Sequence, residues 1–127
     1  MALVRLEKTG GMKAKYNFPA VSVYVKQARL MFNRAAFDAF QELSKGTPVD
    51  YVQIYLDSEN PDVFYLTPAK GDAPDARKLG KSGAKGRFID GSRLLKTLNW
   101  GVDAPTTFKM EKNKKGTLLK VDRSAVV

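Results

Sequence analysis

The sequence predicts a single α+β domain in which two short helices accompany an antiparallel sheet, in the order β-β-α-β-β-loop-α-β-β. Three observations support this class: apolar and polar residues alternate in several short segments, two other segments have helical spacing, and Gly, Pro, Asn and Asp gather between them. Strands joined by short turns beside separate helices are typical of α+β domains. The chain has 127 residues, 43% of them hydrophobic, which is enough for one core over residues 1–127.

The first predicted elements are a strand pair and a helix. Residues 21–25 (VSVYV) place a valine at every second position, which predicts a strand with one buried face. Residues 29–32 form its partner after a tight turn. Asn33 can cap a helix that extends through Glu42 or Leu43, because its side-chain oxygen can accept a backbone N–H of the first turn.

The next predicted elements are a hairpin and a long loop. Residues 51–56 (YVQIYL) alternate in polarity, the polar segment 57–62 reverses the chain, and residues 63–66 return as the partner strand. Residues 68–87 lose all periodicity and gather Pro, Gly, Ala, Lys and Asp. We therefore predict a flexible basic loop at about 68–87.

A short helix and a last hairpin complete the prediction. Ser92 can cap a helix with its leucines inward, and Gly101 can end it. Apolar residues alternate with charged ones over 108–110 and again over 119–121, with an Asn-Lys-Lys-Gly turn at 113–116 between them. This pattern predicts two antiparallel strands.

The chain contains neither cysteine nor histidine. Disulfides, thiolate or imidazole metal sites and Ser-His or Cys-His nucleophile pairs are therefore excluded. General acid–base options are also few, so we expect no cofactor, no metal site and no enzymatic activity. The absence of cysteine fits a reducing compartment, and the early sequence has no apolar run of signal-peptide or membrane-span length. We expect a cytoplasmic protein without a membrane partner.

The net charge of +9 is distributed unevenly along the chain. Residues 1–34 carry a net charge of +6, residues 35–69 carry −5, residues 70–96 carry +5 and residues 97–127 carry +3. Basic flanks around an acidic middle predict a basic surface that attracts nucleic-acid phosphates or an acidic protein.

The stretch LGKSGAKGRF at 79–88 is the first candidate contact. Its Gly80-Lys81-Ser82 resembles the end of a phosphate-binding loop, but Asp75 stands where the first glycine of that loop is required, and further glycines interrupt the helix that should follow. Two interpretations stay open: a glycine-rich segment that contacts a nucleic-acid backbone, and a solvated loop without a ligand. The predicted contacts here and on the following helix are Lys78, Lys81, Lys85, Arg87, Arg93 and Lys96.

The last hairpin adds lysines at and near its tip. A lysine-rich β-ribbon can grip a nucleic-acid backbone, whereas lysines on an exposed edge strand can instead prevent aggregation, and both interpretations stay open. The candidate contacts are Lys112, Lys114 and Lys115, with Lys109 and Lys120 on the adjoining strands.

Tyr51, Tyr55 and Tyr65 are predicted on the polar face of the central hairpin. Stacked tyrosines can bind the bases of single-stranded nucleic acid. However, Asp50 and the carboxylates of segment 57–62 would repel phosphates, so we favour a protein interface or a second core face for these tyrosines. The same carboxylates could bind a hard cation, but their spacing does not match the calcium loop of an EF-hand, which favours a polar turn.

One pattern extends over residues 22–68. The segments VYVKQARLMFNRAAFDAF, YVQIYL and VFYLTP form a basic strand pair, a short helix and a hairpin that ends near a Leu-x-Pro. In this respect the segment resembles the AbrB/MazE swapped-hairpin DNA-binding domain, although Ala28 replaces its usual turn glycine. The resemblance implies that Lys26 and Arg29 lie on the DNA-contacting strand.

We therefore expect a small, non-catalytic basic protein that binds nucleic acid, DNA rather than RNA, through its phosphates. The alternative is a protein-interaction module, such as a small phage or bacterial inhibitor, whose acidic centre and tyrosines bind a protein partner. A homodimer is compatible with both hypotheses.

Overall fold

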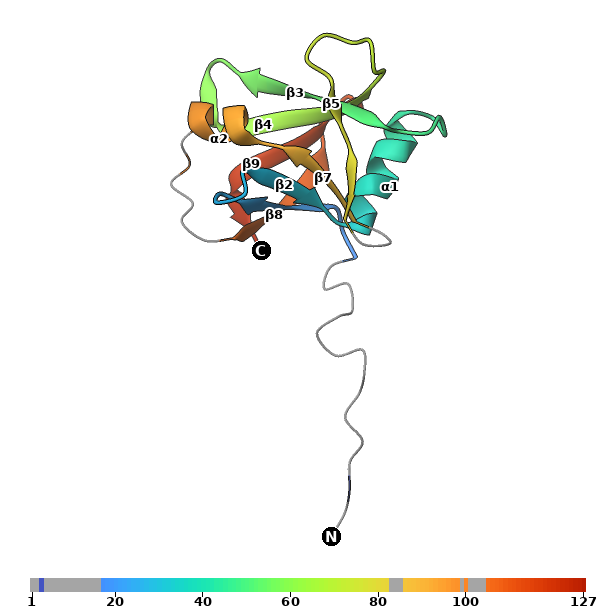
Figure 1. Ribbon diagram of the computed structural model, residues 1–127. Helices are drawn as coiled ribbons and strands as arrows, with labels where there is room; N and C mark the ends of the chain where they lie inside the picture. The colour runs from blue at the N-terminus through green and yellow to red at the C-terminus, as the bar shows by residue number, and fades with distance from the viewer. Residues whose placement is uncertain (1–2, 4–16, 83–85, 99, 101–104) are drawn as a thin grey trace.

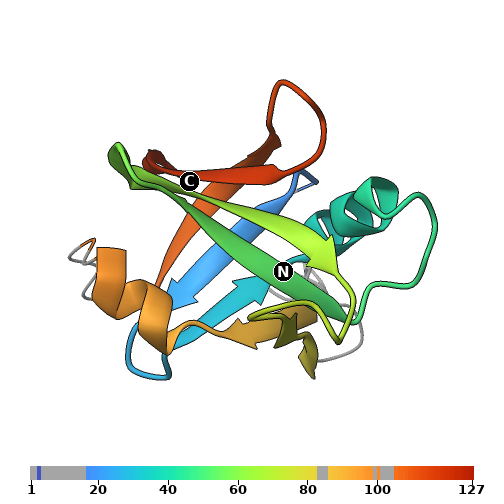
Figure 2. The same cartoon turned by 90° about the horizontal axis from the view of Figure 1, so that it is seen from above.

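The computed structural model of the protein describes Leu3 and residues 17–82, 86–98, 100 and 105–127. These residues form a nine-stranded antiparallel sheet in the order β5-β3-β4-β9-β8-β1-β2-β7-β6, which curls into a nearly closed barrel (Figure 1). Two helices lie on opposite sides of the barrel (Figure 2). The predicted α+β class is confirmed, whereas the predicted order of elements along the chain is wrong, because three further strands stand where one loop was expected.

The elements follow one another with short connections. The strands are β1 (Ala20–Tyr24), β2 (Arg29–Phe32), β3 (Tyr51–Asp57), β4 (Asn60–Ala69), β5 (Arg77–Lys78), β6 (Gly80–Ser82), β7 (Gly86–Asp90), β8 (Thr106–Lys112) and β9 (Leu119–Val126). The helices are α1 (Arg34–Leu43) and α2 (Ser92–Leu98).

The prediction fails between residues 68 and 87, where β5, β6 and the start of β7 replace much of the expected loop. β5 pairs with β3 and β6 pairs with β7, which are the two ends of the remaining sheet. Leu79 lies between β5 and β6, is buried, and donates its backbone N–H to the carbonyl of Asp50 at 2.8 Å. We call residues 77–82 the closing segment, because this one short stretch joins the two edges of the sheet.

The interior of the barrel is apolar. No polar or charged side chain among the described residues is buried. The largest fully buried side chains come from most of the longer strands and from α1, and they are Phe32, Phe40, Phe64, Phe108, Leu30, Leu66, Ile89, Met110 and Leu119. Their alternation with outward residues is the period-two pattern of the sequence, which therefore identified the core strands.

Helix α1 begins where the sequence predicts. The side-chain oxygen of Asn33 accepts hydrogen bonds from the backbone N–H groups of Ala36 at 2.8 Å and Ala20 at 3.1 Å. The cap therefore ties the helix to the first strand as well as satisfying its first turn. Phe40 of this helix packs edge-to-face on Phe32, with ring centroids 5.2 Å apart.

Helix α2 and Trp100 lie on the other side of the barrel. Ser92 is the first helical residue rather than its cap, and the Asp90 carboxylate accepts hydrogen bonds from its backbone N–H and hydroxyl. The Trp100 ring packs against Phe64 and Phe108, with centroids 5.4 and 5.2 Å away. The predicted helix end at Gly101 lies outside the described residues.

Candidate nucleic-acid interface

The turn between β8 and β9 has a defined geometry. The side-chain oxygen of Asn113 accepts the backbone N–H groups of Thr117 at 2.8 Å and Leu118 at 3.1 Å. Gly116 has a φ of +67° and donates its N–H to the Asn113 carbonyl at 2.9 Å. The Asn113 side chain and the positive φ of Gly116 thus hold the turn, and the lysines between them are exposed.

The two strands that carry these lysines are not edges of the sheet. β9 pairs with β4 on one side and β8 on the other, and β8 also pairs with β1. Lysines that prevent aggregation belong on unpaired edges. The edge-protection interpretation therefore does not apply to Lys120, which is paired on both sides, whereas Lys112 lies beyond Lys109, the last β8 residue in register with β1.

These lysines surround an open depression of about 670 Å³, which we call the lysine groove. Three of the predicted contact residues and one predicted interface tyrosine meet there. Its lining consists of Tyr65, Glu111, Lys112, Asn113, Lys114, Lys115, Thr117, Leu118 and Lys120. The structure thus brings together two sets of residues that the sequence analysis had assigned to different surfaces.

A row of side chains runs across the outer face of the sheet beside the groove. Tyr55 of β3 is the cross-strand partner of Tyr65 of β4, which is the partner of Lys120 of β9. Lys120 is in turn opposite Glu111 of β8. The flanking residues of β4 and β9 are buried, so this row faces outward, and Tyr55 is 48% exposed. Tyr51 is not in this row.

The charges of the groove are only partly compensated. Lys112 forms an ion pair with Glu42 of α1 at 2.7 Å, and Lys120 lies 3.9 Å from the carboxylate of Asp122. Lys114 and Lys115 form no ion pair with any residue in the described part of the chain. Two ammonium groups at the tip are therefore available to an anion.

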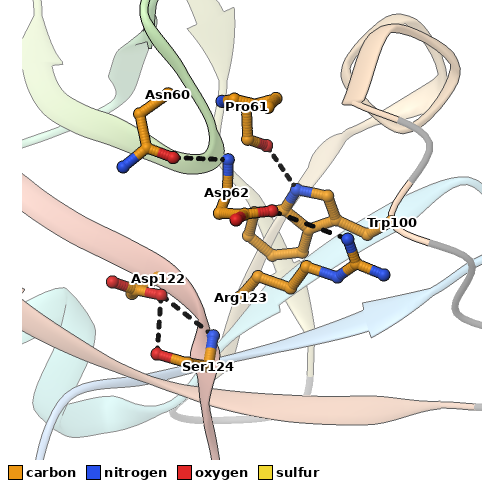
Figure 3. Close-up of polar contacts among 7 residues, drawn as sticks. All are labelled: Asn60, Pro61, Asp62, Trp100, Asp122, Arg123 and Ser124. Atoms are coloured by element: carbon orange, nitrogen blue, oxygen red, sulfur yellow. Dashed lines mark hydrogen bonds and ion pairs between the residues drawn. The ribbon is translucent and has the colours of Figure 1, made fainter.

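The acidic turn between β3 and β4 lies away from the turn between β8 and β9, toward the α2 side of the barrel (Figure 2). Asp62 of this turn pairs with Arg123 at 3.5 Å, and the Pro61 carbonyl accepts the indole N–H of Trp100 at 2.8 Å (Figure 3). The separation of the acidic turn from the groove, together with the positive charge of Arg123, weakens repulsion between the turn carboxylates and a phosphate bound at the groove.

Two hydrogen bonds fix the carboxylate of Asp122 next to this turn. The backbone N–H and the hydroxyl of Ser124 both donate to it, at 2.9 and 2.8 Å (Figure 3). These bonds, chiefly the backbone one, lower the pKa of Asp122 below its ordinary value, and Lys120 adds to the effect. Among the described residues, no group of three or more Asp and Glu side chains is placed to hold a metal ion.

No known protein family, curated protein or solved structure matches the chain. The resemblance of residues 22–68 to the AbrB/MazE domain therefore stays a prediction. Within the described residues, no helix has the length and apolar character that a membrane span requires.

Two of the predicted contact residues pack on aromatic rings. The guanidinium of Arg87 lies 4.2 Å from the ring centroid of Phe37 on α1, and that of Arg29 lies 4.4 Å from the ring centroid of Phe88. Each cation already has a favourable partner in the folded chain, since aromatic faces attract guanidinium groups.

The other predicted contact residues lie outside the lysine groove. Lys78 and Lys81 belong to the closing segment, Arg93 and Lys96 to α2, and Lys26 to the turn between β1 and β2. Lys85 lies outside the described residues. Gly80-Lys81-Ser82 forms strand β6, which leads toward β7 and not directly into a helix, so the context of a phosphate-binding loop is missing.

The tyrosines were separated from the lysines in the sequence analysis because their sequence neighbours are acidic. The position of Lys120 beside Tyr65 follows only from the pairing of β4 with β9. A predicted pairing of β4 with β9 would have placed both residues on one face, but nothing in either segment alone specifies that pairing.

Proposed function

We propose that this protein binds nucleic acid without catalysing a reaction, and that the lysine groove contacts the phosphate backbone. The observation that carries the proposal is the gathering of Lys112, Lys114, Lys115 and Lys120 around one open depression beside Tyr65. Clustered ammonium groups bind phosphates and release condensed counterions, which favours association with any nucleic acid.

Two further observations support this proposal. Lys120 belongs to β9, which is paired on both sides at this residue, so this lysine does not protect a sheet edge. Two lysines of the tip, Lys114 and Lys115, have no carboxylate partner among the described residues. The resemblance to a DNA-binding domain favours DNA over RNA as the first ligand to test.

The direct test is a fluorescence-anisotropy titration with labelled single-stranded and duplex oligonucleotides at several salt concentrations. If four phosphates are contacted on duplex DNA, the affinity should fall about 100-fold between ~50 and ~200 mM salt. Absence of binding to every oligonucleotide at ~50 mM salt would overturn the proposal and favour the protein-interaction alternative.

Two fourfold variants of equal charge locate the contact. In the groove variant, Lys112, Lys114, Lys115 and Lys120 are all changed to alanine. In the control variant, the exposed residues Lys26, Lys78, Lys81 and Lys96 are changed instead.

The groove variant should lose most of the affinity and most of the salt dependence, because it lacks the phosphate contacts. The control variant should keep both, apart from a small effect of net charge. Equal losses in the two variants would show that the contact is spread over the basic surface and is not specific to the groove.

A further inference from the structure

We infer that the lysine groove takes a single strand, whose bases stack on Tyr65 and Tyr55 while its phosphates lie against the lysines. This inference rests on the proposed function and names its ligand. It starts from the outward row Tyr55–Tyr65–Lys120, in which two aromatic rings and an ammonium group come from three successive strands.

The spacing within this row is set by the sheet. Directly opposed residues on antiparallel strands have Cβ atoms about 4.5–5.5 Å apart. The two tyrosines are therefore immediate neighbours, and Lys120 is the next side chain beyond Tyr65. One ligand can contact a ring and the ammonium group beside it at the same time.

The rings are accessible to a ligand. Tyr55 is 48% exposed, and its hydroxyl donates to the side-chain oxygen of Gln53 at 3.3 Å. Tyr65 forms part of the groove wall. An exposed aromatic ring beside a cationic groove is the combination found in proteins that bind single strands, because every base has a face that can stack.

The position of the tyrosines beside the lysines also favours an unpaired strand. In a duplex, each base is stacked between its neighbours, so a tyrosine ring cannot reach a base face without unstacking it. A duplex would meet only the lysines, whereas a single strand can use the lysines and the tyrosines together.

The distribution of charge over the sheet orients the bound strand. The ammonium groups of Lys114 and Lys115, which have no carboxylate partner among the described residues, lie at the β8–β9 tip, and Asp57 lies at the end of β3. We expect the phosphates to lie over β8 and β9, and the bases to lie over β4 and β3.

The experiment compares a labelled single strand and its duplex, in the full chain and in tyrosine variants. The single strand should bind more tightly than the duplex at equal salt. Y65A should weaken binding of the single strand about 5- to 100-fold and leave duplex binding nearly unchanged, because each stacked base contributes measurably. Y55A should act in the same direction, whereas Y65F should retain the affinity, since the ring and not the hydroxyl stacks.

A matched control is Y24A, which removes a partly exposed tyrosine of β1 outside the groove. It should leave both affinities unchanged, and thermal melting should show that each variant is folded. Equal affinity for both ligands, with Y65A and Y55A without effect, would overturn the inference. The proposed function would survive that result if the fourfold lysine variant still lost binding, whereas absence of any binding would overturn both.

Discussion

Two basic, glycine-containing regions of this chain have similar compositions and different structural environments. The region 77–90 includes the closing segment and β7. In this region Arg87 packs on the ring of Phe37, and the guanidinium of Arg29 packs on the ring of Phe88. In the β8–β9 tip, at 112–120, the lysines surround an open groove, and two of them have no carboxylate partner in the described part of the chain. The first region helps to build the barrel, whereas the second exposes its lysines around the groove.

The glycines of the two regions differ in the same way. A Cβ atom at Gly80 would lie 2.4 Å from the Phe88 ring, so the ring packs where a side chain would be. A Cβ at Gly116 would meet nothing within 4 Å, and this glycine is required only by its φ of +67°. A count of charges and glycines cannot distinguish these roles, because one glycine is required by a packed ring and the other by its backbone conformation.

The largest effect that separates the two regions should come from Leu79, which is 8% exposed between β5 and β6. L79A should lower the free energy of unfolding by about 2–5 kcal/mol, because it leaves a cavity where the barrel closes. L118A at the tip, where the side chain is only half-buried, should cost about 1 kcal/mol or less. Urea unfolding of both variants measures the difference. A loss of unfolding free energy in L79A as small as that expected for L118A would show that the closing segment contributes little to the stability of the barrel.

Gly80 provides a steric test of the same comparison. G80A should lower the free energy of unfolding by about 1–3 kcal/mol, because the Phe88 ring must move away from the new methyl group. The matched change G116N should cost a few tenths of a kcal/mol at most, since asparagine tolerates a positive φ and the site is open. Thermal melting of the two variants decides the matter, and a neutral G80A would contradict the packing described for β6 and β7.

Arg87 and Lys114 should give opposite results in two assays. R87A should lower the free energy of unfolding by about 0.5–1 kcal/mol through loss of its contact with Phe37, and it should leave nucleic-acid affinity unchanged. K114A should leave the stability unchanged and reduce the salt slope of binding by about one contact. A loss of affinity in R87A equal to that in K114A would place Arg87 in the binding surface.

The smallest effect concerns the pH dependence of stability at Asp122. Its pKa in the folded protein is lowered from the ordinary 3.8, so the carboxylate contributes stability that is present above 3.8 and is lost as the pH falls through the lowered value. D122N should therefore be less stable than the parent near neutral pH, and the difference should shrink at low pH. Urea unfolding at pH ~6 and ~2.5 tests this, and a difference that is constant with pH would contradict it.

Local patterns in the sequence were sufficient for much of the fold. The valine alternation and the asparagine cap at Asn33 predicted β1 and α1, because both depend on neighbouring residues, but Val25 is exposed and lies beyond β1. The strands β5 and β6 were missed, because segments of two and three residues are too short to show a period. Their pairing with β3 and β7 stabilises them, and no local pattern encodes it.

The candidate site was predictable only in parts. The lysines of the β8–β9 tip and the outward position of Tyr65 followed from turn residues and from alternation. Their meeting follows from the pairing of Tyr65 with Lys120, residues that are distant in the sequence. The acidic sequence neighbours of Tyr65 suggested a different electrostatic environment from the one that β9 supplies.

The pairing of β1 with β8 determines when the barrel can form. The hydroxyls of Ser22 and Thr107 lie 2.7 Å apart across this pair, although 85 positions separate them in the chain. While the protein is being synthesised, β2 can pair with β1 and later with β7, but the other edge of β1 stays open until β8 has left the ribosome. Such distant pairings slow folding, and an open apolar strand is prone to aggregate during the delay. We therefore expect nascent chains that stop before Thr106 to depend on chaperones, which bind exposed apolar segments until the missing strand arrives.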